Sequence, residues 1–158
     1  MNSQAVAFII FLLLFSGSVG AQAPLVDELL SAARSAVSRE LSDSELRSVL
    51  QRGLRHPSGN AVAVVIPRPE ASLVLVFIRQ SNGTFRATDA SGVESGNFGK
   101  LGRPRTDYER YETEPIEWRQ RDDDLLQVVM RTRAWRLGQR YTVAEPLIIE
   151  LDGTVLYR

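Results

Sequence analysis

The side chains best suited to catalysis are scarce in this chain. Its 158 residues include one histidine, His56, and no cysteine. This composition excludes a zinc site built from histidine and cysteine, and it also excludes a cysteine nucleophile. A Ser-His-Asp triad would have to use His56. His56 precedes a proline in an expected loop, and no G-x-S-x-G sequence is present, so we interpret it as a capping or surface residue. We predict no catalytic residue, no cofactor and no metal site.

Two other segments match ligand-binding motifs only in part. Ser95 to Gly102 is rich in glycine, but Glu94 stands where a phosphate-binding loop needs its first glycine, and Leu101 replaces the Ser or Thr that holds magnesium. Asp122 to Asp124 could offer oxygen ligands to a hard cation. Three adjacent aspartates on a strand cannot all point to one ion, so we predict a solvated turn there.

Arginine and aromatic side chains form the strongest candidate for a functional surface. Arg131, Arg133 and Trp135 share one face of an expected strand, and Glu145 follows on the next strand. Cross-strand pairing could join them into a salt-bridged patch of residue types that are common at protein interfaces, with Trp118 and Tyr111 at its border. The alternative interpretation is an ordinary exposed sheet face with cross-strand ion pairs.

The strands that would position this patch form the C-terminal third of the chain. Apolar residues alternate over 116–121, 125–135 and 141–151, with a short strand at 154–157. The expected turns are Asp122 to Asp124, Leu137-Gly138-Gln139 and Asp152-Gly153, the last a strong hairpin signal. Pro146 implies an edge position or a bulge in its strand. Residues 107–158 therefore predict a β-meander, which begins with an edge strand from Tyr108 to Glu114.

The N-terminal part of the expected domain is helical. Apolar residues from Pro24 to Leu41 follow helical spacing, and Pro24 suits the first helical position. Ser42-Asp43-Ser44-Glu45 then forms a capping box that starts a second apolar stripe, ending before His56. The pattern predicts either two amphipathic helices with a tight bend near Ser42 or one long helix that is kinked there.

Between the helices and the meander, the pattern predicts a hairpin, one further strand and a loop. Ala61 to Ile66 and Leu73 to Ile78 are almost continuously apolar, which indicates strands that are covered on both faces, and a weaker strand spans Thr84 to Thr88. Residues 89–106 lack periodicity and predict a functional or mobile glycine-rich loop. The fold class is α+β: two N-terminal amphipathic helices packed on one face of a largely antiparallel sheet of about six or seven strands.

The end of the chain resembles a known fold family. Gly138 to Glu145 has the form G-x-x-Y-x-V-x-E, and Asp152-Gly153-Thr154-Val155 follows as a closing D-G-T-V. This order resembles the last strands of the nuclear-transport-factor-like cone. The resemblance covers the last quarter of the chain, and no site residue is transferred from it.

The first residues have the pattern of a secretory signal peptide. Ala5 to Phe15 is an unbroken apolar run, followed by small residues that end in Val19-Gly20-Ala21. We expect cleavage near Ala21, a mature start at Gln22 and one domain over 22–158. The alternative is a retained anchor helix, and a membrane would be a partner only in that case. The 19 basic and 19 acidic residues balance, so we expect no nucleic-acid partner.

These observations favour a secreted or periplasmic, non-catalytic binding protein whose partner is an unknown protein or small molecule. The alternative is a small-ligand carrier or enzyme with a cone-like cavity between the helices and a curved sheet. Glu145 should distinguish the two. A buried, unpaired carboxylate would indicate a cavity, whereas a carboxylate paired with Arg131 or Arg133 would be structural.

Overall fold

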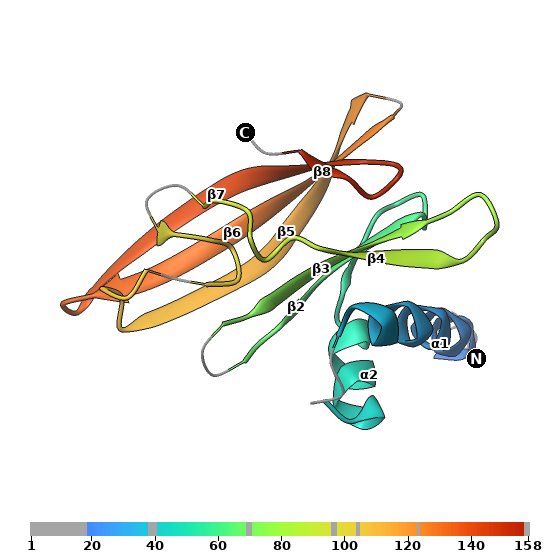
Figure 1. Cartoon of the computed structure of the whole chain (residues 1–158), viewed down its shortest axis with the longest axis horizontal. Coiled ribbons are helices and arrows are strands. Elements are labelled where there is room, and N and C mark those ends of the chain that lie inside the picture. Colours follow the sequence, from blue (N-terminus) through green and yellow to red (C-terminus); the bar gives the residue numbers. More distant parts are fainter. Residues whose placement is uncertain are drawn as a thin grey trace, which may run out of the picture.

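The computed structural model describes residues 19–37, 41–68, 71–95, 98–103, 105–122 and 124–156. Two helices pack against antiparallel strands, which confirms the predicted α+β class. The strands form two four-stranded sheets instead of one (Figure 1). Residues 1–18, most of the predicted signal peptide, lie outside the described residues.

The two helices are separate, and the second begins at the predicted capping box. Helix α1 spans Val19–Ala36 and helix α2 spans Asp43–Gln51. The backbone N–H of Glu45 donates to the Ser42 hydroxyl at 3.3 Å, and the Ser42 N–H donates back to the Glu45 carboxylate at 2.9 Å. These bonds satisfy donors that the first helical turn leaves without intrahelical partners.

Helix α1 differs from its prediction at both ends. It starts at Val19, so Pro24 lies inside the helix and not at its first position. Proline has no N–H, and the helix therefore forgoes one backbone bond at this turn. The helix ends at Ala36, short of the predicted Leu41. In the described part of the chain, neither helix has the length and apolar character of a membrane span.

The first sheet is the central layer of the molecule. Its strands pair antiparallel in chain order: β1 (Leu54–Arg55), β2 (Ala61–Ile66), β3 (Leu73–Arg79) and β4 (Phe85–Asp89). Val62, Val64 and Phe77 face the helices and join their apolar core. Ala63 and Val76 face the second sheet. Burial on both faces explains why β2 and β3 are almost continuously apolar.

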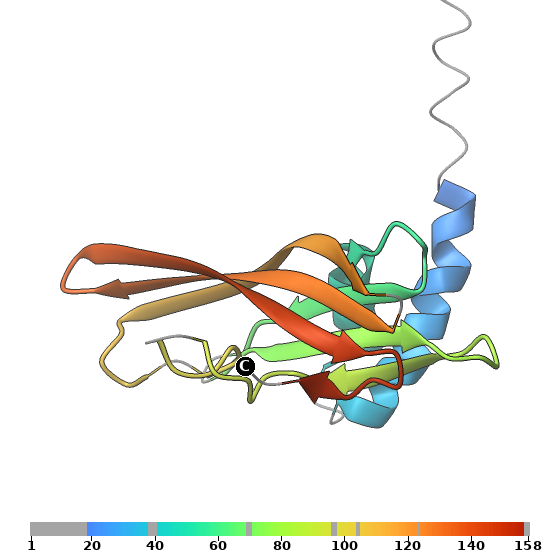
Figure 2. The same ribbon diagram turned by 90° about the horizontal axis from the view of Figure 1, so that it is seen from above.

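The second sheet is longer and curls into a half-barrel (Figure 2). It contains β5 (Arg110–Asp122), β6 (Leu125–Arg136), β7 (Gln139–Glu150) and β8 (Val155–Leu156), again antiparallel and in chain order. The predicted strands at 108–114 and 116–121 are one strand, because Ile116 is accommodated by a break in register between Pro115 and Glu117. Asp123, in the predicted aspartate turn, lies outside the described residues.

The turn between β6 and β7 contains two residues, where three were expected. β6 ends at Arg136 and β7 begins at Gln139, which pairs with Arg136. Leu137 and Gly138 both have positive φ angles, 50° and 72°, as a two-residue hairpin turn requires. Pro146 lies on a stretch of β7 that β8 does not reach, since β8 pairs only with Ile148 and Ile149. The predicted edge position of Pro146 is therefore confirmed.

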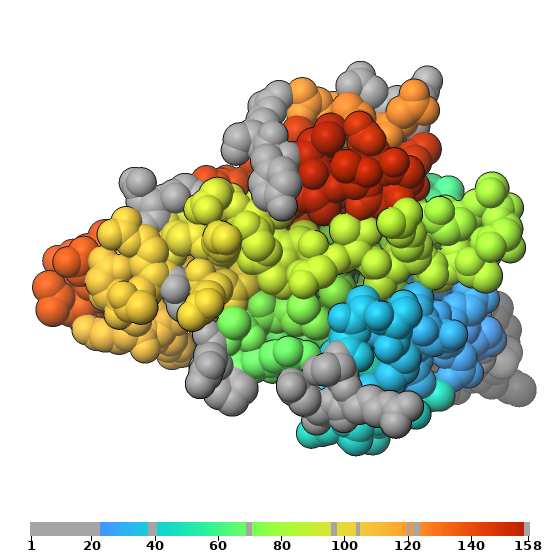
Figure 3. All heavy atoms as spheres, viewed as in Figure 1, coloured from blue at the N-terminus to red at the C-terminus, as the bar shows by residue number. Residues whose placement is uncertain are grey.

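The glycine-rich loop covers one side of the molecule between the two sheets (Figure 3). Ser95, Phe98 and Leu101 are buried. Gly102 lies close to the start of β3, and its carbonyl accepts from the Ser72 N–H at 2.6 Å. Its own N–H donates to the Ser91 carbonyl. The described part of the loop is therefore packed onto the sheets.

Candidate functional site

The structure divides the six predicted patch residues between the two faces of the second sheet. Arg131, Arg133 and Trp135 lie on one face of β6, opposite Glu114, Glu112 and Arg110 of β5. Glu145 pairs with Met130, so its side chain lies on the other face. That inner face, directed toward the first sheet and the loop, also holds Tyr111 and Trp118.

A one-residue difference in turn length accounts for the position of Glu145. A three-residue turn at Leu137 to Gln139 would have paired Arg131 with Glu145. The observed two-residue turn pairs Arg131 with Ala144. Because side chains alternate along a strand, a shift of one residue exchanges the two faces.

The outer face of the second sheet carries a ladder of ion pairs. We use the term outer face for the part of this surface nearest the β6–β7 turn, which is formed by Arg110, Glu112, Glu114, Arg131, Arg133, Trp135, Arg140, Thr142 and Ala144. Nε of Arg131 donates to a Glu114 oxygen at 2.8 Å, and Nη2 of Arg133 forms an ion pair with the same oxygen at 2.8 Å. The Arg110 guanidinium lies 4.6 Å from the centre of the Trp135 ring.

These ion pairs bring the predicted arginines and tryptophan together, but with partners from β5. The side chains of Arg133 and Glu114 are 28% and 42% exposed. Exposed pairs contribute little stability, typically below about 1 kcal/mol each. Their main effect is to hold the arginine side chains in fixed positions on the surface.

The inner face contains a group of hydroxyls that the sequence analysis did not identify. The hydroxyl of Thr132 lies 3.3 Å from those of Ser95 and Thr113, and Thr113 donates to the Leu101 carbonyl at 2.9 Å. All three residues are buried. The alternation of β6 was the available signal, because Thr132 falls among the apolar positions of the core face. These hydroxyls fasten the glycine-rich loop to the sheet.

Tyr111 extends this hydroxyl group and has a perturbed acidity. Its phenol donates to the Lys100 carbonyl at 2.8 Å. Burial raises the pKa of Tyr111, the hydroxyls of Thr113, Thr132 and Ser95 partly offset the rise, and the Glu145 carboxylate adds to it. A tyrosine with a raised pKa stays protonated at neutral pH. It therefore acts as a hydrogen-bond donor and is unsuited to act as a base.

Trp118 connects the two sheets. Its indole N–H donates to the Leu54 carbonyl of β1 at 3.0 Å, and its ring meets His56 edge-on with 5.4 Å between ring centres. His56 also accepts from the Ser58 N–H at 3.1 Å. These contacts are those of a structural histidine in a turn, as the sequence suggested.

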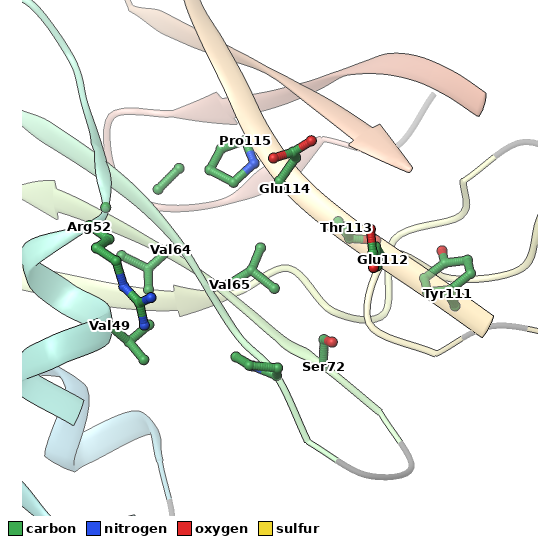
Figure 4. Close-up of a pocket in the computed structure, with 13 residues that line it drawn as sticks. Val49, Arg52, Val64, Val65, Ser72, Tyr111, Glu112, Thr113, Glu114 and Pro115 are labelled. Carbon is green, nitrogen blue, oxygen red and sulfur yellow. The ribbon is translucent and has the colours of Figure 1, made fainter. Parts of the chain in front are cut away.

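A groove lies where the edges of the two sheets approach each other. It has a volume of about 320 Å³ and is bounded by Val64 and Val65 of β2, by residues 111–115 of β5 and by Val49 and Arg52 near the end of α2 (Figure 4). The groove depends on how the two sheets meet, and no sequence pattern predicts that arrangement. Among the described residues, no cluster of three or more His, Cys, Asp or Glu side chains could hold a metal ion.

Comparisons with known proteins give no further indication of function. Neither the protein-family models, nor the curated proteins, nor the solved structures contain a match to this chain.

Proposed function

We propose that the protein is a non-catalytic binding protein, secreted or periplasmic after removal of its leader, that docks a protein partner on the outer face of the second sheet. The main support is the composition and position of that face. The helices cover one side of the first sheet, and the second sheet covers the other. In the described residues, no element packs over the outer face, which presents Trp135 among ordered arginines.

The charges of the outer face favour an acidic partner. Four arginines stand there with two glutamates, Glu112 and Glu114. The cross-strand ion pairs hold the Arg131 and Arg133 side chains before binding, so less conformational entropy is lost when a partner docks. Thr142 and Ala144, which pair with Arg133 and Arg131, are small and exposed. Tryptophan and arginine are the residue types that most often dominate binding energy at interfaces.

The alternative, a carrier or enzyme with a cone-like cavity, receives less support. That function requires space between the helices and the curled sheet. In this fold, the first sheet occupies that space, with Val62 and Phe77 packed toward the helices and Ala63 and Val76 packed toward the second sheet. Glu145, the polar group expected in such a cavity, is half-buried beside the Tyr111 phenol.

Site-specific photo-cross-linking in the host tests the proposed surface. A photoreactive residue at Thr142 should cross-link one defined protein, whereas the same residue at Ser35, exposed on α1 and outside the groove lining, should not. The product should decrease in about 0.5 M salt, which screens charge pairs, and on Trp135→Ala. Equal cross-linking from both positions, or a product unaffected by salt and by Trp135→Ala, would contradict the proposal.

The localisation has its own test. The intact mass of the protein from the extracytoplasmic fraction should correspond to a chain that begins at Gln22. A full-length species found only with membranes would exclude a cleaved leader.

A further inference from the structure

The groove between the sheets is bordered by two open strand edges. On the first sheet, β1 pairs with β2 only at Val62 and Ala63, so in the described part of the chain β2 continues beyond it toward Ile66 with no strand paired on that side. On the second sheet, β5 is the outermost strand. The two edges belong to different sheets and face each other across the groove (Figure 4).

The direction of the backbone groups on β2 follows from its hydrogen bonds. The Asn60 carbonyl accepts from the N–H of Arg79, the last residue of β3, whereas the Ala61 carbonyl accepts from the His56 N–H on the β1 side, both at 2.8 Å. Backbone groups alternate in direction along an antiparallel strand. The N–H and C=O of Val65 therefore point to the β1 side, beyond the end of β1 and into the groove.

The position of Pro115 indicates in which direction the backbone N–H and C=O groups of β5 point. Pro115 has no N–H, and such a residue fits a strand position whose backbone faces away from the neighbouring strand. The register with β6 is regular from Tyr111 to Pro115, so Tyr111 and Thr113 direct their backbone groups to the same open side. Thr113 is only 8% exposed.

We infer that this groove binds a short extended segment of a partner protein, which adds as a strand to the edge of β5 and also meets Val65 of β2. Added strands are held by main-chain hydrogen bonds, and side-chain pockets give specificity. The stretch from Tyr111 to Pro115 spans about 13 Å at the usual rise per residue. Pro67 and Pro115 lie at the ends of the open stretches, so only a short segment can pair.

The side chains around the groove define the segment further. Val49 and Val64 offer an apolar wall at the α2 end (Figure 4). Arg52 lies beside them, with its Nε bonded to the Ser48 carbonyl at 3.2 Å, and it can pair with a carboxylate through its terminal nitrogens. Glu112 and Glu114 line the β5 side of the groove, but their carboxylates are already paired with Arg131 and Arg133. We therefore expect a segment that combines apolar residues with an acidic residue near Arg52. The groove shares Glu112 and Glu114 with the outer face, whereas the Val65, Tyr111 and Thr113 amides, on which the tests below depend, do not belong to that face.

Amide hydrogen exchange on the full chain tests whether the edges are open. In the free protein, the amides of Val65 and Tyr111 should exchange much faster than that of Val64, which faces β3. Equal protection of these amides would show that the edges are already occupied. Protection that increases with protein concentration would indicate a second copy of the chain. Either result would overturn the inference.

Short random peptides displayed on phage supply the ligand for the second test. Selected peptides should combine apolar and acidic residues and protect the Val65, Tyr111 and Thr113 amides. Val65→Pro removes the groove-facing N–H and should weaken these peptides about fivefold, whereas Val65→Ala, which keeps it, should change affinity less than about twofold. The inference would be refuted if the selected peptides bound without protecting these amides, or if no peptide bound better than its scrambled form. Both outcomes are measured on the wild-type chain and do not require Val65→Pro to fold.

Discussion

The close contact between Gly102 and the start of β3 allows us to predict how much a larger residue at position 102 destabilises the fold. A Cβ added at Gly102 would lie 2.2 Å from the Ser72 carbonyl oxygen and 2.6 Å from the Ser91 Cβ. The loop cannot move away cheaply, because Gly102 bonds to both Ser72 and Ser91 through its backbone. Overpacking of this kind costs about 1–3 kcal/mol, and a loop that shifts would lose about 1 kcal/mol per hydrogen bond. We expect Gly102→Ala to lower the free energy of unfolding by about 2–3 kcal/mol.

Gly92 provides the matched control, since nothing lies within 4 Å of a Cβ added there. Gly92→Ala should change the free energy of unfolding by less than about 1 kcal/mol. Urea unfolding of both variants measures the difference, and an unchanged m-value would show that the unfolded states are comparable. Amide exchange should also show faster opening at Val93 and Leu101 in Gly102→Ala. If the two variants were equally stable, the close approach of the loop would not be part of the folded state.

Three further predictions concern the capping box, a buried phenol and a hairpin turn. Ser42→Ala should lower stability at pH 7. The Ser42 bonds to the Glu45 carboxylate lower the pKa of Glu45. The part of the deficit that depends on this charge should be fully present above the unfolded pKa of a glutamate and should be lost as the pH falls through the lower folded value. The part due to the Glu45 N–H bond to the Ser42 hydroxyl should remain, as urea midpoints at several pH values would show. Tyr111→Phe should be less stable than wild type at pH 7. Because burial raises the pKa of Tyr111, its contribution is fully present below about pH 10, and the deficit should shrink as the pH rises further, which urea unfolding in alkaline buffers would measure. Leu137→Asn should raise the free energy of unfolding by about 0.5–1 kcal/mol, because Leu137 has a φ of 50° and is 84% exposed, and asparagine suits this turn position better than leucine; a lower thermal midpoint would contradict this.

The features that the sequence predicted correctly depend on local patterns. The Ser42 capping box involves residues three positions apart, and the hairpin of Ala61 to Ile66 with Leu73 to Ile78 depends on two apolar runs and the turn between them. The double burial of β2 and β3 was also visible, because a strand with one solvated face alternates and these strands do not.

The parts that were not predicted depend on single-residue shifts and on contacts between distant segments. The break in register at Ile116 places Trp118 on the inner face, although regular alternation would have put it on the same side as Glu114. The length of the turn at Leu137 moved Glu145 in the same way. The groove depends on how the two sheets meet, and no local pattern encodes that arrangement.

The order of the strands has a consequence for how the chain folds. In both sheets, every strand pairs with its neighbour in the sequence, so each hairpin can close as soon as its second strand is available. Folds that are rich in such local contacts generally reach the native state quickly. Docking of the two sheets is different, because the bond from Trp118 to Leu54 joins residues 64 positions apart. We therefore expect the two halves to form first and their association to be the slow step of folding.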